Sequence, residues 1–346
     1  MRETVGPLGP TRLRIVLAFA AVYVIWGSTY LAIRVAIETL PPHTMAGARF
    51  ALAGILLYAW ARRRGAPRPD AGHWVQATIV GGFLLLGGNG GVVWAEQRVP
   101  SGMAALLIAT VPLWMVLLEW WRGGARPSRG VALGLGLGIA GVGLLVSSRG
   151  MASGQRVDPL GATVLILAAL SWAFGSLYSR GARLPKSPLL ATAMEMLMGG
   201  VLLLAAGPLR GEWAHFDAHL VSTPSLVALA YLLCFGSLLG FTAYIWLLHH
   251  TTAARAATYA FVNPLVAVIL GWALAGEALE ARTLLAAGII VGAVCIIVTA
   301  RARATRPASS PAGVAATAVA AGPTSGNEPS RSAATSRQDA EGVAAD

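Results

Sequence analysis

The sequence predicts an all-α integral membrane protein with ten transmembrane helices, arranged as two inverted five-helix repeats. Three observations predict this class: the composition, ten long apolar runs, and an internal repeat. Of the 346 residues, 56% are hydrophobic and only 12% are charged. Soluble domains are roughly 45–50% apolar and about 25% charged, and disordered chains carry far less apolar surface. The composition therefore excludes a soluble globule and a disordered chain for most of the sequence.

The apolar runs have the length of membrane-spanning helices. A hydrocarbon core of about 30 Å needs about 20 apolar residues in a helix, and a helix satisfies every backbone polar group in lipid. The runs lack the alternating pattern of porin strands, which span the bilayer in about 9–11 residues. We therefore predict ten spans, in chain order 15–33, 44–61, 74–95, 101–121, 130–148, 159–178, 188–209, 224–248, 252–275 and 283–300.

These spans divide the chain into four parts. We expect a cytoplasmic N-terminal segment over residues 1–14, a first five-helix repeat over 15–148 and a second over 159–300. Residues 305–346 are rich in Ala, Ser, Thr, Gly and Pro and present no apolar face. Such a composition cannot bury a core, so this part is predicted to be a disordered cytoplasmic tail.

The basic residues predict the orientation of the chain. If the N-terminus is cytoplasmic, 19 of the Lys and Arg residues fall on the cytoplasmic side and 6 fall in loops on the opposite side. Basic residues gather on the cytoplasmic side of membrane proteins. Both termini are therefore predicted to be cytoplasmic, in a multi-pass protein of the cytoplasmic (inner) membrane.

An internal repeat relates the two halves of the sequence. The stretch Trp94–Trp120 overlays Trp246–Trp272 without a gap, at an offset of 152 residues (246 minus 94), and Pro112 meets Pro264. Five spans per half is an odd number, so the second copy enters the membrane from the opposite side. Inverted repeats are typical of secondary transporters that work by alternating access, and duplication for packing alone is the other reading. Further matched residues are Gly88 with Gly240, Gly54 with Gly200, and Arg49 with Glu195.

Several motifs in both halves resemble one known family. They are Trp26–Tyr30, Met45–Phe50, Pro100–Ala105, Ser171–Ser176 and Tyr259–Pro264. Together they resemble EamA-domain proteins of the drug/metabolite transporter superfamily, over about residues 15–300. The resemblance implies ten helices, cytoplasmic termini and export of small molecules from a central cavity, but it implies no particular substrate.

Arg49 and Glu195 are charged residues inside apolar runs. Such residues are costly in lipid and usually face a partner or a water-filled cavity. We expect one of them to contact substrate, or Glu195 to carry a proton during transport, and as repeat mates the two could also form an ion pair. The alternative is a structural role near the membrane edge, where long side chains extend to the headgroups.

Aromatic and small polar side chains within the spans are candidates to line a substrate cavity. Trp and Tyr offer a flat apolar face with one polar tip, although the same residues also anchor helices at the membrane interface. Glu96, at the end of its span, is expected at the mouth of a pathway or in solvent. The predicted substrate-binding residues are Trp26, Ser28, Tyr30, Asn89, Trp94, Trp172, Ser176, Tyr178, Glu195, Tyr244, Trp246, Tyr259 and Asn263.

Glycines recur within the predicted spans, where they permit close approach between helices. In the run over 130–148 the glycines singled out for packing are Gly134, Gly136, Gly138, Gly141 and Gly143. Gly288 and Gly292 take a similar place in the last span. We expect these residues to thin their helices for packing.

The sequence offers no constellation for catalysis or for a cofactor. It has no HExxH motif and no Walker motif, and Cys234 and Cys295 lack the CxxC spacing of a metal or redox site. The basic residues form no stripe of the kind that binds nucleic acid. We therefore expect no catalytic residue, no metal and no cofactor, with a small-molecule substrate and the lipid bilayer as partners and the oligomeric state left open.

These observations favour a secondary transporter that is not an enzyme. It would export small organic metabolites, such as amino acids, related metabolites or drugs, across the cytoplasmic membrane by alternating access of the two repeats. A channel, or a lipid or glycolipid flippase of the same fold, is the alternative.

Overall fold

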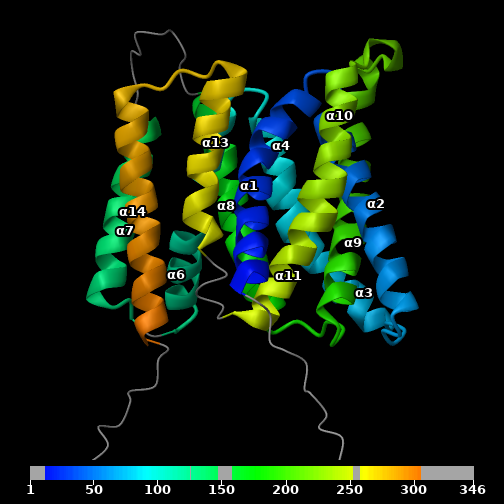
Figure 1. Cartoon of the computed structure of the whole chain (residues 1–346), viewed down its shortest axis with the longest axis horizontal. Helices are drawn as coiled ribbons and strands as arrows, with labels where there is room; N and C mark the ends of the chain where they lie inside the picture. The colour runs from blue at the N-terminus through cyan, green and yellow to red at the C-terminus, as the bar shows by residue number, and fades with distance from the viewer. Residues whose placement is uncertain (1–11, 125, 147–157, 252–257, 305–346) are drawn as a thin grey trace, which may run out of the picture. The chain divides into compact units, whose positions relative to one another are not determined.

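The computed structural model describes residues 12–124, 126–146, 158–251 and 258–304. These lie in one compact unit, and residues 305–346, the predicted tail, lie outside the described residues. Every regular element in the described part is a helix (Figure 1). The longer elements in chain order are α1 (Arg12–Ala36), α2 (Pro42–Arg63), α3 (Ala71–Gly81), η1 (Gly82–Asn89), α4 (Gly90–Ala95), α5 (Ser101–Ile108), α6 (Val111–Trp121), α7 (Arg129–Val146), α8 (Pro159–Ser179), α9 (Pro188–Leu209), α10 (Thr223–Tyr231), η4 (Leu232–Leu239), α11 (Gly240–His250), α13 (Tyr259–Ala275) and α14 (Ala281–Ala304).

The helices confirm the predicted fold class. Among the described residues, nine helical stretches are long and apolar enough to cross a membrane. The stretch over Ser101–Trp121 consists of α5 and α6, which are separated at a turn just before Pro112. The tenth predicted span is represented by α13, a shorter apolar helix of 17 residues, and the start of that prediction, residues 252–257, lies outside the described residues.

The bundle has two ends, which we name by residues close to them. The Glu96 end carries the C-terminal ends of α1, α4 and α9, and the Arg14 end carries the N-terminal end of α1 and the C-terminal end of α14. Figure 1 shows the start of α1, in dark blue, and the end of α14, in orange, at the same end of the bundle. The described chain therefore begins and ends on one side of the bundle.

Helices α2 and α9 are repeat mates and share the most extensive contact between described helices. Three glycines bring their backbones together. A Cβ atom placed on Gly54 would lie 2.5 Å from the backbone nitrogen of Leu197 and 2.8 Å from the carbonyl oxygen of Ala193, and Gly47 and Gly200 face the opposite backbone in the same way. Close approach through small residues is a main source of helix association in lipid, where burial of apolar surface supplies no driving force.

A second pair of repeat mates, α7 and α14, also packs together. Gly134 and Gly141 face Ile297 and Ile290 of α14, and Gly138 faces Leu113 of α6. The prediction of glycine packing is confirmed for these three residues. It is wrong for the glycines at 136, 143, 288 and 292, which have no neighbouring atom within 4 Å of a Cβ position.

Both repeats contain a π-helix at a corresponding place. The third span of the first repeat runs through η1 and that of the second through η4, 150 residues later (232 minus 82), and each segment has 8 residues. A π-helix is rare and is frequent at functional sites. Its recurrence indicates that the distortion belongs to the repeat itself.

Two glutamates of the second repeat cap helices of the first repeat at the Glu96 end. Glu212, after α9, accepts hydrogen bonds from the backbone nitrogens of His43 (2.9 Å) and Thr44 (3.1 Å) at the start of α2. Glu277, after α13, accepts from the backbone nitrogens of Ser101 (2.6 Å) and Gly102 (3.0 Å) at the start of α5. Carboxylates satisfy the free N–H groups of a helix start and complement its dipole. The two repeats are thereby joined at this end.

Gly54→Ala is expected to destabilise the protein, because the added methyl group meets the backbone of α9, which cannot move aside. We expect a loss of about 1–3 kcal/mol in the free energy of unfolding, the usual cost of overpacking. Thermal unfolding of the detergent-solubilised protein measures it. Gly136→Ala is the matched control, since this helical glycine faces open space and its replacement should be neutral or slightly stabilising. Equal unfolding temperatures for the two variants would contradict the packing role of Gly54.

Glu212→Gln is expected to weaken the cap of α2. Burial alone would raise the pKa of Glu212, but hydrogen bonds from His43 and Thr44 outweigh it and lower the pKa to about 2. A carboxyl with a lowered pKa stabilises the folded protein above its unfolded pKa near 4, and this contribution is lost as the pH falls towards 2.

The Gln variant should therefore unfold at a lower temperature at pH 7, by a free energy of about 1.5–3 kcal/mol, the range for hydrogen bonds to charged groups. The difference from the parent should shrink at pH 3. Glu38→Gln, at an exposed position on the same end, is the control. A difference that stays constant with pH would argue against ionised Glu212 as the cap.

Candidate functional site

Four aromatic rings form a cluster between α1, α11 and α13. The Trp26 ring centre lies 5.1 Å from that of Phe241, 5.2 Å from Tyr244 and 5.0 Å from Tyr259. Tyr244 and Tyr259 also meet edge to face, at 5.5 Å. The structure thus brings together three of the predicted substrate-binding residues, Trp26, Tyr244 and Tyr259. Such edge and tilted contacts are favourable between aromatic rings, and they present flat apolar faces with hydroxyl groups beside them.

The π-helix η4 fixes one side of this cluster. The indole Nε1 of Trp26 donates a hydrogen bond to the carbonyl oxygen of Gly236, at 3.2 Å. Gly240, at the start of α11, lies against the same indole, and a Cβ atom there would collide with it. The missing side chain of Gly240 therefore leaves the space that the Trp26 indole needs to reach the backbone of the opposite repeat.

Arg49 of α2 also contacts η4. Its side chain is buried, with 4% of the residue exposed, and its Nε donates to the hydroxyl oxygen of Ser237 at 2.8 Å. The guanidinium carbon lies 4.5 Å from the ring centre of Phe50. Among the described residues Arg49 forms no ion pair, with Glu195 or with any other carboxylate. A buried cation without a counter-ion is costly, so this group is available to an anionic ligand.

A related arrangement occurs in the other half of the bundle. Trp172 of α8 lies against Gly88 of η1, and Ser171 donates to the carbonyl oxygen of Phe83 at 2.8 Å. Gly88 and Gly240 are repeat mates, and each contacts a tryptophan on the first helix of the opposite repeat. The predicted residue Asn89 belongs to η1. The exchange of contacts between repeats is the relation that an inverted duplication produces.

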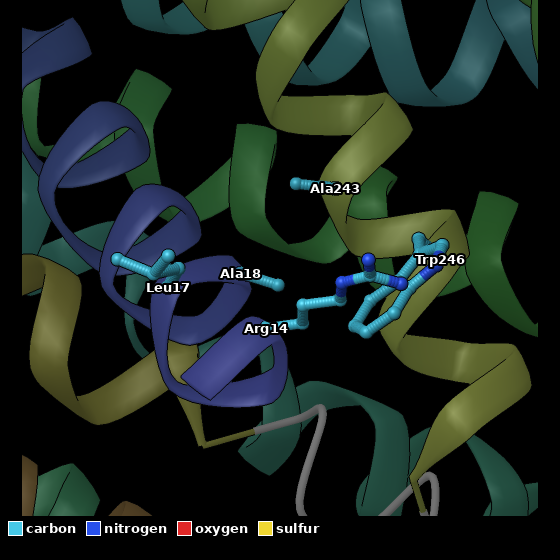
Figure 2. A pocket seen from close by; sticks show the side chains of 5 residues that line it. All are labelled: Arg14, Leu17, Ala18, Ala243 and Trp246. Atoms are coloured by element: carbon cyan, nitrogen blue, oxygen red, sulfur yellow. The ribbon is translucent and has the colours of Figure 1, made fainter. Parts of the chain in front are cut away.

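A pocket of about 290 Å³ lies near the Arg14 end, between α1 and α11. It is lined by Arg14, Leu17, Ala18, Ala243 and Trp246, and Figure 2 shows the Arg14 side chain extending from α1 towards Trp246. Eight residues along α1 separate Ala18 from Trp26, a rise of about 12 Å in a helix. The pocket therefore lies below the aromatic cluster on the same pair of helices.

The remaining predicted residues lie elsewhere. Trp94 is near the Glu96 end, where the guanidinium groups of Arg98 and Arg210 lie 5.1 Å and 5.7 Å from its ring centre. Tyr178 donates to Gln76 at 2.7 Å, near the Arg14 end. Ser28 is hydrogen-bonded to the hydroxyl group of Tyr231 at 2.6 Å, and Tyr30 packs against the main core. Ser176 is half-buried on α8, and Glu195 is half-buried on α9 beside α3. Asn263 is buried on α13, and its amide oxygen has no hydrogen-bond partner among the described residues.

The two ends of the bundle differ in their cores. The main core cluster joins α1, α2, α5, α7, α9 and α14, and it holds the buried residues nearest the Glu96 end. Towards the Arg14 end two smaller clusters replace it: one around Leu113, from α6, α7 and α14, and one around Leu190, from α2, α3 and α9. Figure 1 shows these two groups of helices on opposite sides of the bundle. Among the described residues the main core cluster thus reaches the Glu96 end, whereas residues 252–257, which follow α11 at the Arg14 end, lie outside the described residues.

Glu96 corrects one expectation. The prediction that it lies in solvent is wrong, because the residue is fully buried, with 0% exposed. Within the described ranges, both of its carboxylate oxygens lack a hydrogen-bond partner. Glu96 follows the span that ends at Ala95. Burial, reinforced by the nearby Glu277 carboxylate, raises the pKa of Glu96 well above its ordinary value.

Sequence reasoning missed several residues of this region. Phe241 and Ser237 were indistinguishable from other members of an apolar run, since the one-residue shift that a π-helix introduces decides which face they occupy. The caps formed by Glu212 and Glu277 join residues about 170 positions apart, as in the separation of 169 between His43 and Glu212. The sequence around each of these residues does not indicate a partner so far away in the chain. In the part of the chain that the structure describes, no cluster of three or more His, Cys, Asp or Glu side chains is placed to hold a metal ion.

Ten apolar helices in two related halves, with aromatic and charged groups facing one another between the halves, define an integral membrane transport protein. The EamA-like transporter family matches residues 13–147 and 159–299, and the chain belongs to this family. The two matched segments correspond to the two five-helix halves.

Curated relatives and a solved structure agree with this assignment. The chain is 42% identical over 284 residues to the uncharacterised inner membrane transporter YedA of Escherichia coli strain K12, covering 81% of this chain and 89% of that protein. It is 26% identical over 302 residues to the uncharacterised transporter YvbV of Bacillus subtilis strain 168, covering 84% and 93%. A crystal structure with 22% sequence identity matches with a TM-score of 0.57, over 84% of this chain and 99% of that chain, and shares the fold.

Proposed function

We propose that this protein is a secondary exporter of small organic solutes that carry a carboxylate group. The observation that carries the proposal is the buried guanidinium of Arg49, which has no carboxylate partner among the described residues and contacts the same π-helix as Trp26 of the aromatic cluster. A hollow between α1 and α11, nearer the Arg14 end, lies on the same pair of helices as that cluster.

The distribution of basic residues supports placing the Arg14 end in the cytoplasm. Loading from the cytoplasm then proceeds through the pocket beside Arg14, which attracts anions, and on to Trp26, Tyr244 and Tyr259. Ligand pockets usually have volumes of about 300–1,000 Å³, and the hollow of about 290 Å³ beside Arg14 lies near the lower end of that range, which favours a small solute. Release on the opposite side requires the Glu96 end to open and the Arg14 end to close.

The two repeats supply this change in the proposed cycle. If each repeat adopts the conformation of the other, the packing now present at the Glu96 end forms at the Arg14 end. The related contacts of Gly88 with Trp172 and of Gly240 with Trp26 support such an exchange. Both involve π-helices, in which a shift of one residue moves the side chains that face the pathway.

The buried guanidinium of Arg49 supports a substrate that carries a carboxylate group. Its buried guanidinium has Ser237 as a hydrogen-bond acceptor and no carboxylate partner among the described residues. A guanidinium holds a carboxylate through two parallel hydrogen bonds, and the aromatic faces nearby suit the apolar part of such a solute. Amino acids, related organic acids and acidic drugs all fit this description.

Transport is tested with purified protein in liposomes. Vesicles loaded with an unlabelled carboxylate are placed in a trace of the labelled compound, for a panel of small carboxylates and their amides. A carrier produces saturable counterflow, in which the label accumulates transiently. A channel gives unsaturated conductance without counterflow, and a flippase moves labelled lipid instead, and either result would overturn the proposal.

Arg49→Gln is expected to raise the KM for carboxylate substrates by about 10- to 100-fold, the loss of a charge-assisted hydrogen bond. Transport of the corresponding amides should change little. Arg63→Gln is the matched control, because Arg63 is an exposed cation on the same helix. If Arg49→Gln affects acids and amides equally, its role is structural and the substrate class is wrong.

A further inference from the structure

Glu96 is a buried carboxyl group whose two oxygens have no hydrogen-bond partner among the described residues. The residue is 0% exposed. An ionised carboxylate in such a place would cost far more than a protonated one. Buried polar groups are nearly always partnered, and an exception calls for an explanation.

Two charged groups act on the Glu96 carboxyl: the Arg34 cation favours its ionised form, and the Glu277 anion opposes it. Arg34 on α1 donates through Nη1 to the backbone carbonyl oxygen of Glu96, at 2.5 Å, and not to its carboxylate. Glu277, whose negative charge acts on Glu96, is hydrogen-bonded to the start of α5. Tyr30 of α1 also lies near Glu96. Elsewhere at the same end, Arg98 pairs with Asp158, the residue before α8, at 3.5 Å, and His43 of α2 pairs with Glu212 at 2.6 Å.

We propose that Glu96 binds a proton while the Glu96 end is closed and releases it when that end opens, so that proton binding and closure are coupled. The proposal rests on the alternating access inferred above. On opening, the carboxyl O–H bond breaks, the proton passes to water, and the Arg34 guanidinium turns from the backbone carbonyl to the carboxylate beside it. The ionised carboxylate also repels Glu277, which holds the cap of α5.

The direction of the pH dependence follows from linkage. The closed form binds the proton more tightly than the open form, in which the carboxyl is hydrated and has its ordinary pKa. Closure is therefore fully favoured below that ordinary pKa and weakens as the pH rises towards the raised pKa of the closed form. A more alkaline solution at the Glu96 end opens it, and a more acidic one closes it.

The test measures the opening of the Glu96 end without any substrate. Cys234 and Cys295 are replaced by Ser and Ala, and Ala104→Cys is introduced on α5, at a position that is 0% exposed and reacts only when this end opens. Intact cells are treated with a membrane-impermeant maleimide between external pH 5.5 and 7.5. Ala214→Cys, at an exposed position on the same end, is the reference that corrects for the reactivity of thiols at each pH.

With Glu96 present, the corrected labelling rate is expected to rise by about tenfold or more over these two pH units, since one coupled proton allows at most about tenfold per unit. In Glu96→Gln the rate should be low and change less than about twofold. Glu38→Gln, an exposed glutamate on the same side, should keep the parental profile. A flat profile in the parent, or an unchanged slope in Glu96→Gln, would overturn the proposal.

A second variant, Arg34→Gln, tests the same coupling if the Glu96→Gln protein does not fold. Arg34→Gln removes the cation that receives the ionised carboxylate, so the pH of half-opening should move upward. A merely structural effect would change labelling by the same factor at every pH and would contradict the proposal. If the Ala214→Cys reference reacts only in inverted vesicles, the orientation in the proposed function is wrong. The labelling of Ala104→Cys across the same pH range is then repeated in inverted vesicles, where it still tests the role of Glu96.

Discussion

The contact between α2 and α9 is the constraint on which the arrangement of the two halves depends. In lipid, helices gain little from burying apolar surface, so their association relies on close packing. Gly47, Gly54 and Gly200 let two backbones meet where any side chain would collide. The contact holds one helix of each repeat in register, and the neighbouring spans take their places around it. The positions of Arg49 on α2 and of the π-helix that it contacts follow from this register.

The π-helices supply the groups that position the side chains of the candidate site. In η4 the backbone carbonyl of Gly236 accepts a hydrogen bond from Trp26, while the adjacent Ser237 accepts one from Arg49. An indole from one helix and a guanidinium from another thus converge on one short segment of the opposite repeat. In η1 the corresponding surface meets Trp172 and Ser171 instead. The two repeats share a backbone distortion but differ in the side chains placed on it, and only one carries a buried cation.

The sequence alone predicts the helices well, because hydropathy is a local property and a bilayer imposes one length on every span. The repeat was also visible, since Trp94 and Trp246 stand at equivalent positions in an ungapped stretch.

The site was only partly predictable. Trp26, Tyr244 and Tyr259 were chosen as aromatic residues within spans, but Trp94 and Tyr178, chosen for the same reason, lie near opposite ends of the bundle. The side of a helix that faces the partner repeat depends on packing contacts and on the π-helices. The hydropathy of the sequence predicts neither of these. Glu96 shows the same limit: its place at the end of a span indicated solvent, whereas contacts from distant parts of the chain bury it.

The caps at the start of α2 and α5 have a consequence for biosynthesis. Both capping carboxylates come from the second half of the chain, so the ribosome makes the two helix starts long before it makes Glu212 and Glu277. Until then the first N–H groups of these helices must be satisfied by water at the membrane surface. The starts of α2 and α5 therefore gain their protein caps only after the second half has been made. A chain that lacks the second half would leave these polar helix starts uncapped.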